Sequence, residues 1–310
     1  MQIDPLSDTL SLLRPRSYIS SGFEAGGEWS LQFDSQEGLI KCYAVTGGEC
    51  LLVVEGNDDP ISLCEGDCFV LPSGRRFWMG NNREIPTSSA RDFFPAARNG
   101  GVVRINDGAG FRLIGARFAV GGPYAADLLA VLPPIIHIHR NTDQDALRWS
   151  VELMMQELRR SQVGGQLISQ HLAHIMLVQA LRHHLEEAPL SGIGWFSALA
   201  DPHLARALSA LHNQVARRWS LQEIASEAGM SRSAFSSLFK DRVGDTPMEY
   251  LTRLRMLHAI DRLEQGQDTV STISADLGYE SESAFSTAFK RFSGTSPRQY
   301  GRQIVAAAAE

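Results

Sequence analysis

The 310-residue sequence lacks any long apolar run and any excess of basic charge. No window approaches the ~18 consecutive apolar residues of a membrane-spanning helix. The first residues also lack the basic and apolar regions of a signal peptide, so we expect a cytoplasmic protein with no membrane contact. The formal net charge is -6, which argues against a protein that coats nucleic acid through general positive charge.

Cysteine is scarce, with 4 residues in the chain. In a reducing compartment we expect no stable disulfides. Cys42, Cys50, Cys64 and Cys68 fall within one region of predicted strands and turns, where free cysteine commonly packs as a small apolar residue. Redox sensing by these thiols stays open as an alternative. A zinc site is disfavoured, because the Cys64-x3-Cys68 spacing differs from that of a zinc knuckle.

The composition is otherwise ordinary for a globular protein, with 44% hydrophobic and 21% charged residues. A chain of this length predicts about two domains, each able to bury a core. Residues 201–310 hold 13 basic and 13 acidic residues, so the whole net charge of -6 lies in residues 1–200. A neutral domain of this kind binds DNA only if its cations gather on one side.

The most informative feature is a duplication in the last third of the chain. Seven residues recur fifty positions later: Ser231, Phe235, Phe239, Lys240, Gly244, Pro247 and Tyr250 correspond to Ser281, Phe285, Phe289, Lys290, Gly294, Pro297 and Tyr300. Each copy is typical of a helix-turn-helix, two short helices joined by a turn that contains Gly. We predict helices over 221–228 and to about 243 in the first copy, and over 270–277 and to about 292 in the second. Ser231 and Ser281 are placed to cap the second helix of each pair.

Each second helix has one apolar and one polar face. The polar faces carry Arg232, Ser233, Ser236, Ser237 and Lys240 in the first copy, and Glu282, Ser283, Ser286, Thr287 and Lys290 in the second. Hydroxyl groups can contact base edges in a major groove, and Lys or Arg can reach guanine or phosphate. A solvated surface is the alternative for either helix alone, but the duplication favours contact with double-stranded DNA.

A long helix is predicted between the two copies, from Thr246-Pro247 to a stop at Gly266. Its roughly nineteen residues, at about 1.5 Å each, span about 28 Å. Successive major-groove faces of one duplex are ~34 Å apart. One chain could therefore read two adjacent turns of DNA from one side.

Several segments closely resemble the DNA-binding domain of AraC/XylS transcription regulators: Ala228-Gly229-Met230-Ser231, Gly244-Asp245-Thr246-Pro247, Gly278-Tyr279-Glu280-Ser281 and Gly294-Thr295-Ser296-Pro297. The resemblance implies that the linking helix aligns two reading helices on DNA. Carried over by position, it implies base contacts for Ser233, Ser236, Ser237, Glu282, Ser283, Ser286 and Thr287. We expect Arg298 to contact phosphate. The family also implies an activator, with RNA polymerase as a partner.

Residues 29–120 show short strands broken by Gly and Asp turns. The predicted strands span 29–33, 39–46, 50–54, 61–64, 68–71, 102–105 and 111–120, a pattern typical of a sandwich or small barrel. The segment Leu63-Cys64-Glu65-Gly66-Asp67-Cys68 resembles the Gly-Asp turn of a cupin. Together with the upstream segment, it is similar to the cupin-type sensor half of AraC-like regulators, which implies a binding site for a small-molecule effector.

Many cupins bind a metal through histidines, but the aligned positions here hold Tyr43 and Phe77. We therefore expect no metal, no other cofactor and no catalytic residues. A metal-dependent cupin enzyme with a DNA-binding tail is the less favoured alternative. Tyr43, Arg75, Phe77 and Trp78 are the candidate effector-binding residues. His137-Ile138-His139 has the alternating spacing of a metal-binding pair, but no carboxylate is spaced nearby in the sequence.

Residues 143–160 and 166–187 are predicted amphipathic helices that pair as a hairpin. The hairpin either closes the sensor domain or forms the surface of a homodimer. We predict an α+β protein: a cupin-like β-barrel with a helical hairpin in residues 1–190, then an all-α domain with two helix-turn-helix motifs in residues 200–305. The predicted function is a sequence-specific DNA-binding transcription regulator, an activator controlled by a small effector, with thiol-based redox sensing as the alternative.

Overall fold

The computed structural model describes residues 4–13, 16–36, 38–94, 102–119, 129, 131–140, 145–160, 163–187 and 193–307. The chain divides into two compact units. One unit comprises Arg14–Ala188, and the other combines Met1–Leu13 with Pro189–Glu310. The N-terminal helix α1 (Pro5–Leu13) thus belongs with the C-terminal helices, whereas the sequence analysis placed residues 1–190 in one domain.

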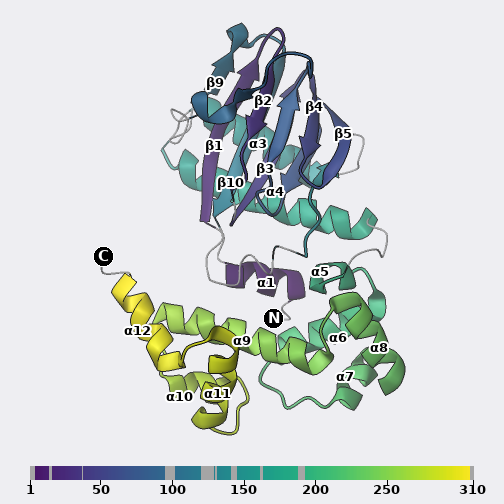
Figure 1. The fold of residues 1–310 in the computed structure, drawn as a ribbon, viewed down its shortest axis with the longest axis vertical. Helices are drawn as coiled ribbons and strands as arrows, with labels where there is room; N and C mark the ends of the chain where they lie inside the picture. Colours follow the sequence, from purple (N-terminus) through teal and green to yellow (C-terminus); the bar gives the residue numbers. More distant parts are fainter. Residues whose placement is uncertain are drawn as a thin grey trace. The chain divides into compact units, whose positions relative to one another are not determined.

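The unit Arg14–Ala188 is built on two sheets (Figure 1). One sheet has six strands in the order β11-β6-β3-β10-β1-β9, and the other has five in the order β5-β4-β7-β2-β8. The strands are β1 (Arg16–Ala25), β2 (Ser30–Phe33), β3 (Leu39–Gly47), β4 (Glu49–Val54), β5 (Asn57–Cys64), β6 (Cys68–Leu71), β7 (Phe77–Gly80), β8 (Ser88–Ser89), β9 (Val102–Ile105), β10 (Phe111–Ala119) and β11 (Ile136–Ile138). Over the described residues these strands form two separate sheets rather than a closed barrel.

The core of this unit lies between the two sheets. Along β4, the side chains of Cys50, Leu52 and Val54 are buried in alternation, as expected for a strand with one face in the core. β3 is buried along most of its length. One of its faces lines the core through Tyr43 and Val45, and the other packs against α4 (Gly165–Glu187). A strand covered on both faces shows no alternation of burial.

The predicted helical hairpin is present as α3 (Asp145–Arg160) and α4, which pack against each other. α4 covers the outer face of the six-stranded sheet, with contacts to β1, β3, β6 and β11. The hairpin also exposes large apolar side chains, with Trp149 56% and Leu167 59% exposed. A homodimer formed through this face stays a prediction.

The second unit is helical. Its helices are α1, α5 (Trp195–Ala198), α6 (Pro202–Asn213), α7 (Leu221–Glu227), α8 (Arg232–Val243), α9 (Pro247–Gln265), α10 (Val270–Asp276), α11 (Glu282–Ser293) and α12 (Pro297–Ala307). The pairs α7–α8 and α10–α11 are the two predicted helix-turn-helix motifs, and they lie toward opposite ends of α9 (Figure 1). No helix in the described part of the chain is long and apolar enough to cross a membrane.

A buried carboxylate explains why α1 groups with the C-terminal helices. α1 packs on α6 and α9, and Asp8 is 6% exposed. Its carboxylate accepts hydrogen bonds from His212 Nδ1 at 2.6 Å and His258 Nε2 at 3.2 Å. His212 Nε2 lies 2.7 Å from the hydroxyl of Tyr250. The N-terminal helix is therefore held by polar groups more than two hundred residues away.

Candidate DNA-binding surface and effector pocket

The exposed faces of α8 and α11 repeat each other position by position. In both helices two phenylalanines are fully buried: Phe235 and Phe239 in α8, Phe285 and Phe289 in α11. The residues exposed at equivalent positions are Ser233, Ser237 and Lys240 in α8, and Ser283, Thr287 and Lys290 in α11. Ser236 and Ser286 are both half-buried at the edge of this stripe, as is Glu282, whereas Arg232 is exposed. The two copies in the sequence therefore present the same pattern of exposed side chains on α8 and α11.

Equivalent serines and glycines fix the geometry of both motifs. The hydroxyl oxygens of Ser231 and Ser281 each accept a hydrogen bond from the backbone N–H three residues later, at 3.4 and 3.1 Å. Such caps satisfy a backbone donor that the helix leaves free. Gly229 and Gly278 occupy the turns with φ values of 69° and 77°, a left-handed conformation that glycine adopts without steric cost.

Several arginines of this unit already have partners within the chain. Arg298 Nη2 donates to Glu282 Oε1 at 2.7 Å, so two of the predicted DNA-contacting residues lie side by side. On the linking helix α9, Arg253 pairs with Asp245 at 2.9 Å. Arg255 donates to two backbone carbonyls of the loop after α6. Of these cations, Arg298 is the one adjacent to a reading helix.

Thr287 has a defined orientation in α11. Its hydroxyl donates to the backbone carbonyl of Ser283 at 3.0 Å. The hydroxyl proton is therefore engaged within the helix, while the oxygen lone pairs and the methyl group stay available. A methyl group on a reading helix can contact the methyl of thymine. This side chain suits an apolar base contact better than its counterpart Ser237.

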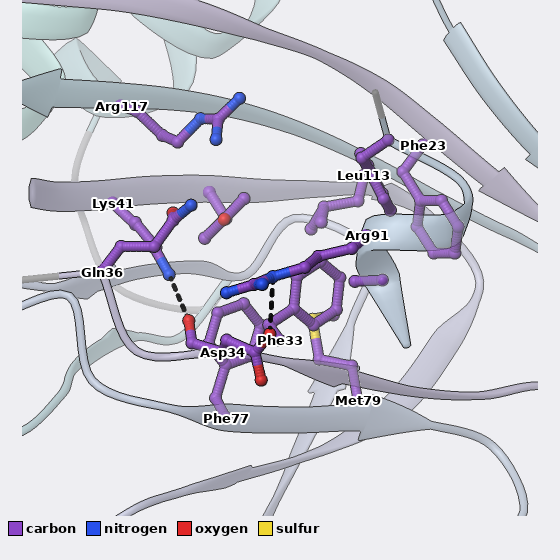
Figure 2. Close-up of a pocket in the computed structure, with 13 residues that line it drawn as sticks. Phe23, Phe33, Asp34, Gln36, Lys41, Phe77, Met79, Arg91, Leu113 and Arg117 are labelled. Carbon is purple, nitrogen blue, oxygen red and sulfur yellow. Dashed lines mark hydrogen bonds and ion pairs between the residues drawn. The ribbon is translucent and has the colours of Figure 1, made fainter. Parts of the chain in front are cut away.

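A cavity of about 100 Å³ lies between the two sheets of the other unit (Figure 2). Its walls are mainly aromatic: Phe23, Phe33, Tyr43, Phe77 and Phe94. The rings of Phe33 and Phe77 stack with centroids 4.4 Å apart and planes 5° from parallel. The polar residues that line it are Asp34, Gln36, Lys41, Arg91 and Arg117. Concave, mostly apolar sites with a few placed polar groups are typical of small-molecule binding.

The structure brings two of the four candidate effector residues to this pocket. Tyr43 and Phe77 line it, with ring centroids 6.0 Å apart. Trp78 lies outside it and donates from Nε1 to Ser30 Oγ at 2.8 Å, because adjacent side chains of a strand point to opposite faces. Arg75 also lies outside the pocket and donates from Nη1 to the backbone carbonyl of Glu55 at 3.2 Å.

The charged residues of the pocket, above all Lys41, were not predicted from the sequence. This lysine is 2% exposed, and its Nζ lies 5.1 Å from the centroid of the Phe77 ring. Burial lowers the pKa of Lys41 to about 8, and the nearby charge of Arg117 acts in the same direction. A signal existed in the sequence, since Lys41 interrupts an apolar strand at a position that shares its face with Tyr43.

The fold brings a carboxylate to the histidine pair that had none nearby in sequence. Asp67, His137 and His139 each offer a ligand atom, all within 4.8 Å of one another. Asp67 also accepts backbone hydrogen bonds from Cys64 at 3.0 Å and Arg140 at 2.8 Å. These bonds satisfy the buried carboxylate and fix the Gly-Asp turn, so we assign Asp67 a structural role.

The cysteines are poorly placed for redox chemistry. Burial raises the pKa of the Cys68 thiol to about 12, and it raises the pKa of Cys42 and Cys50 still further. At Cys64, desolvation and the hydrogen bond to Asp67 also raise the pKa. Since the thiolate is the form that reacts with oxidants, these environments disfavour thiol-based sensing.

Two helix-turn-helix pairs on one linking helix, together with a separate sheet unit, define the class of DNA-binding regulators. Comparison with protein families agrees with this class. Residues 4–186 match a cupin family, and residues 224–303 match a helix-turn-helix domain family.

Similar proteins extend over almost the whole chain. A putative AraC-like transcription regulator from Streptomyces lividans is 41% identical over 96% of this chain and 98% of its own length. The HTH-type transcriptional regulator AlkR from Acinetobacter baylyi is 32% identical over 89% of this chain and 92% of its own. ToxT from Vibrio cholerae, solved with a bound unsaturated fatty acid, is 12% identical over 93% of this chain and 94% of that chain, with a TM-score of 0.37.

The chain belongs to the AraC family of DNA-binding transcription regulators. It is a regulator and not an enzyme, and its N-terminal half is a cupin-type domain.

Proposed function

We propose that this AraC-family regulator reads two adjacent major grooves with α8 and α11, and that a small effector bound between the two sheets controls its activity. The observation that supports DNA reading most strongly is the repeated surface stripe. Two helices with the same buried residues expose hydroxyl groups and a lysine at the same positions. A helix that presents such a face fits a major groove, which an α-helix can enter.

Within this proposal the residues divide into two roles. Ser233, Ser237, Ser283 and Thr287 contact base edges, with Ser236 and Ser286 at the margin of the stripe. The cations Arg232, Lys240, Lys290 and Arg298 contact phosphates, which position the helices and supply salt-dependent affinity. Glu282 can accept from the amino group of cytosine, and its ion pair with Arg298 holds the carboxylate in place.

Control by an effector requires different affinities for two states of the protein. The aromatic pocket, with Tyr43 and Phe77 in its walls, is the site we assign to the effector. The activating direction follows from the family resemblance, with RNA polymerase as the partner, and a reporter fused to a target promoter measures it. Because its target is chromosomal DNA, we place the regulator in the cytoplasm.

Base contacts and phosphate contacts predict different mutant behaviour. DNA selected from random duplexes by the full chain supplies the target sequence. We expect Ser237→Ala and Thr287→Ala each to relax preference at one half-site, with about a tenfold loss there. Lys290→Ala should instead weaken binding to all sequences and reduce the salt slope by about one. Fluorescence anisotropy at several salt concentrations measures both effects.

Arg104→Ala serves as the matched cation control, because Arg104 is exposed and pairs with Glu24 in the sheet unit. It should leave binding and salt slope unchanged. If the selection yields no preferred sequence, the proposed DNA reading fails. If Ser237→Ala and Lys290→Ala behave alike, the assignment of the two roles is wrong.

A further inference from the structure

The pocket between the sheets has a polar end and an apolar end. In Figure 2, Lys41, Gln36 and Arg117 lie on one side, and Phe23, Leu113 and Met79 lie on the other. A ligand that fills this space must therefore have a polar head and an apolar body. The cavity volume of about 100 Å³ limits that body to a compact group.

The polar end carries an excess of positive charge. Among the residues that line the pocket, Lys41, Arg91 and Arg117 are cationic and Asp34 is the one acid. The carboxylate of Asp34 is occupied by Arg91, with 2.8 Å between Oδ2 and Nε. Neither Lys41 nor Arg117 forms an ion pair with a carboxylate among the described lining residues, although the charge of Asp34 acts on Lys41 from farther away.

Lys41 is the decisive residue, because a buried ammonium group needs compensation. Buried charges in proteins are normally paired or hydrogen-bonded, since their desolvation is costly. Lys41 is 2% exposed, and it donates a long hydrogen bond of 3.5 Å to the backbone carbonyl of Asp34. The contact with the Phe77 ring at 5.1 Å is a weak substitute for an anion. The pocket therefore supplies a buried positive charge that an anionic ligand would neutralise.

We propose that this pocket binds a small monocarboxylate with a compact, flat apolar body, whose carboxylate pairs with Lys41 and Arg117. The stacked rings of Phe33 and Phe77 form a flat wall for the body, and Phe23 closes the far end. This inference rests on the proposed function in that it names the chemical class of the effector. The same pocket is unsuited to neutral sugars, which need several hydrogen-bonding partners along the whole ligand.

The comparison of acids with their amides tests the charge requirement on the unaltered full chain. Benzoate and phenylacetate are compared with benzamide and phenylacetamide, respectively, at pH 7, by calorimetry and thermal shift. We expect at least one acid to bind at millimolar concentration or better, and its amide to bind at least tenfold more weakly. If no acid binds at about 10 mM, or if an amide binds equally well, the proposal is overturned.

Lys41→Met removes the charge while keeping most of the length of the side chain. We expect it to lower the affinity for the bound acid at least tenfold and to leave the affinity for the amide unchanged. Arg112→Met is the matched control: Arg112 lies on β10 like Arg117 but is exposed, and its loss should not change acid binding. Equal acid binding by wild type and Lys41→Met contradicts the proposal.

The pH profile gives a readout that a merely structural lysine would not produce. The groups that face Lys41 are Asp34 and Arg91, which pair with each other, Arg117, and Tyr43, whose pKa is raised by burial. Since the pKa of Lys41 is about 8, acid affinity should fall as pH rises from 7 to 9. The Lys41→Met protein should show a flat profile over this range, and a flat profile in the wild type counts against the proposal.

The outcome is separable from that of DNA binding. Acid binding is measured without DNA, and specific DNA binding is measured without the acid. A protein that selects a DNA sequence but binds no carboxylate refutes the effector class alone. A protein that binds the acid through Lys41 but selects no DNA sequence refutes the proposed DNA reading alone.

Discussion

Asp8 shows how a single side chain can define the boundary of a unit. Burial of this carboxylate would by itself raise its pKa, but the hydrogen bonds and charges of His212 and His258 outweigh that effect and lower the pKa below its ordinary value. A carboxylate with a lowered pKa in the folded state stabilises that state wherever it is ionised. Asp8 therefore ties α1 to α6 and α9 at neutral pH.

We expect Asp8→Asn to lower the free energy of unfolding of the helical unit by about 2 kcal/mol, because a charged hydrogen-bond acceptor is lost from a buried position. Urea unfolding of the full chain, followed by circular dichroism, measures the effect. The difference in the free energy of unfolding between wild type and Asp8→Asn should have its full value at pH 5. It should shrink as the pH falls below ~4, the pKa of Asp in the unfolded chain. Exposed Glu227 gives the control Glu227→Gln, and equal stability of Asp8→Asn and wild type would refute the role.

At this scale the sequence was informative about the DNA-reading face and less so about the pocket. The reading face could be predicted because the repeat supplied two independent copies of the same helix. Tyr43 and Phe77 were found through the cupin alignment. Lys41 was missed because a lysine in a strand ordinarily lies at an exposed edge. Its burial depends on the second sheet, whose Phe77 on β7 lies across the pocket from it, and that contact is distant in sequence.

At the scale of elements, the two helix-turn-helix motifs are the best-predicted parts of the chain. Capping residues mark their ends locally, so α7, α8, α9 and α11 begin within a residue of the predicted positions. Strands β1, β7, β8 and β11 were missed. β7 has four buried residues and so lacks the alternation that marks a strand. β1 contains three serines and a glycine, which are not typical strand residues. These strands form by pairing with strands that lie far away in the sequence, so local patterns do not predict them.

The two turn glycines offer a matched test of the motif geometry. Gly229 and Gly278 share a positive φ, so alanine at either position is strained by about 1 kcal/mol. At Gly278 the added methyl group would also collide with the backbone carbonyl of Ala216, whereas at Gly229 it meets only the end of the Arg206 side chain, at 3.2 Å. We expect Gly278→Ala to cost about 3 kcal/mol or more and Gly229→Ala about 1 kcal/mol.

Thermal or urea unfolding of the two variants measures the difference. The exposed glycine after α11, Gly294, also has a positive φ, of 80°, and no neighbour that a methyl group would meet. Gly294→Ala is therefore the control for conformational strain alone. Equal costs for Gly278→Ala and Gly294→Ala would show that the turn of the second motif is not packed as described.

At the scale of the whole molecule, the fold class was predictable and the course of the chain was not. An α+β protein with a cupin-type domain and two helix-turn-helix motifs follows from local patterns and from a recognisable family. The division of the chain does not, because α1 joins the C-terminal unit through Asp8 and two distant histidines. The unit that holds the pocket is thus connected in sequence, at both of its ends, to the unit with the helix-turn-helix motifs.

The most direct test of the central claim is a hydroxyl-radical footprint of the full chain on its selected DNA, with methylation interference to locate major-groove contacts. We predict two major-groove patches about one helical turn, 10–10.5 base pairs, apart on one face of the duplex. Ser237→Ala should weaken interference at one patch and Thr287→Ala at the other. A single patch, or two patches on opposite faces of the duplex, would contradict an account in which α8 and α11 read consecutive grooves.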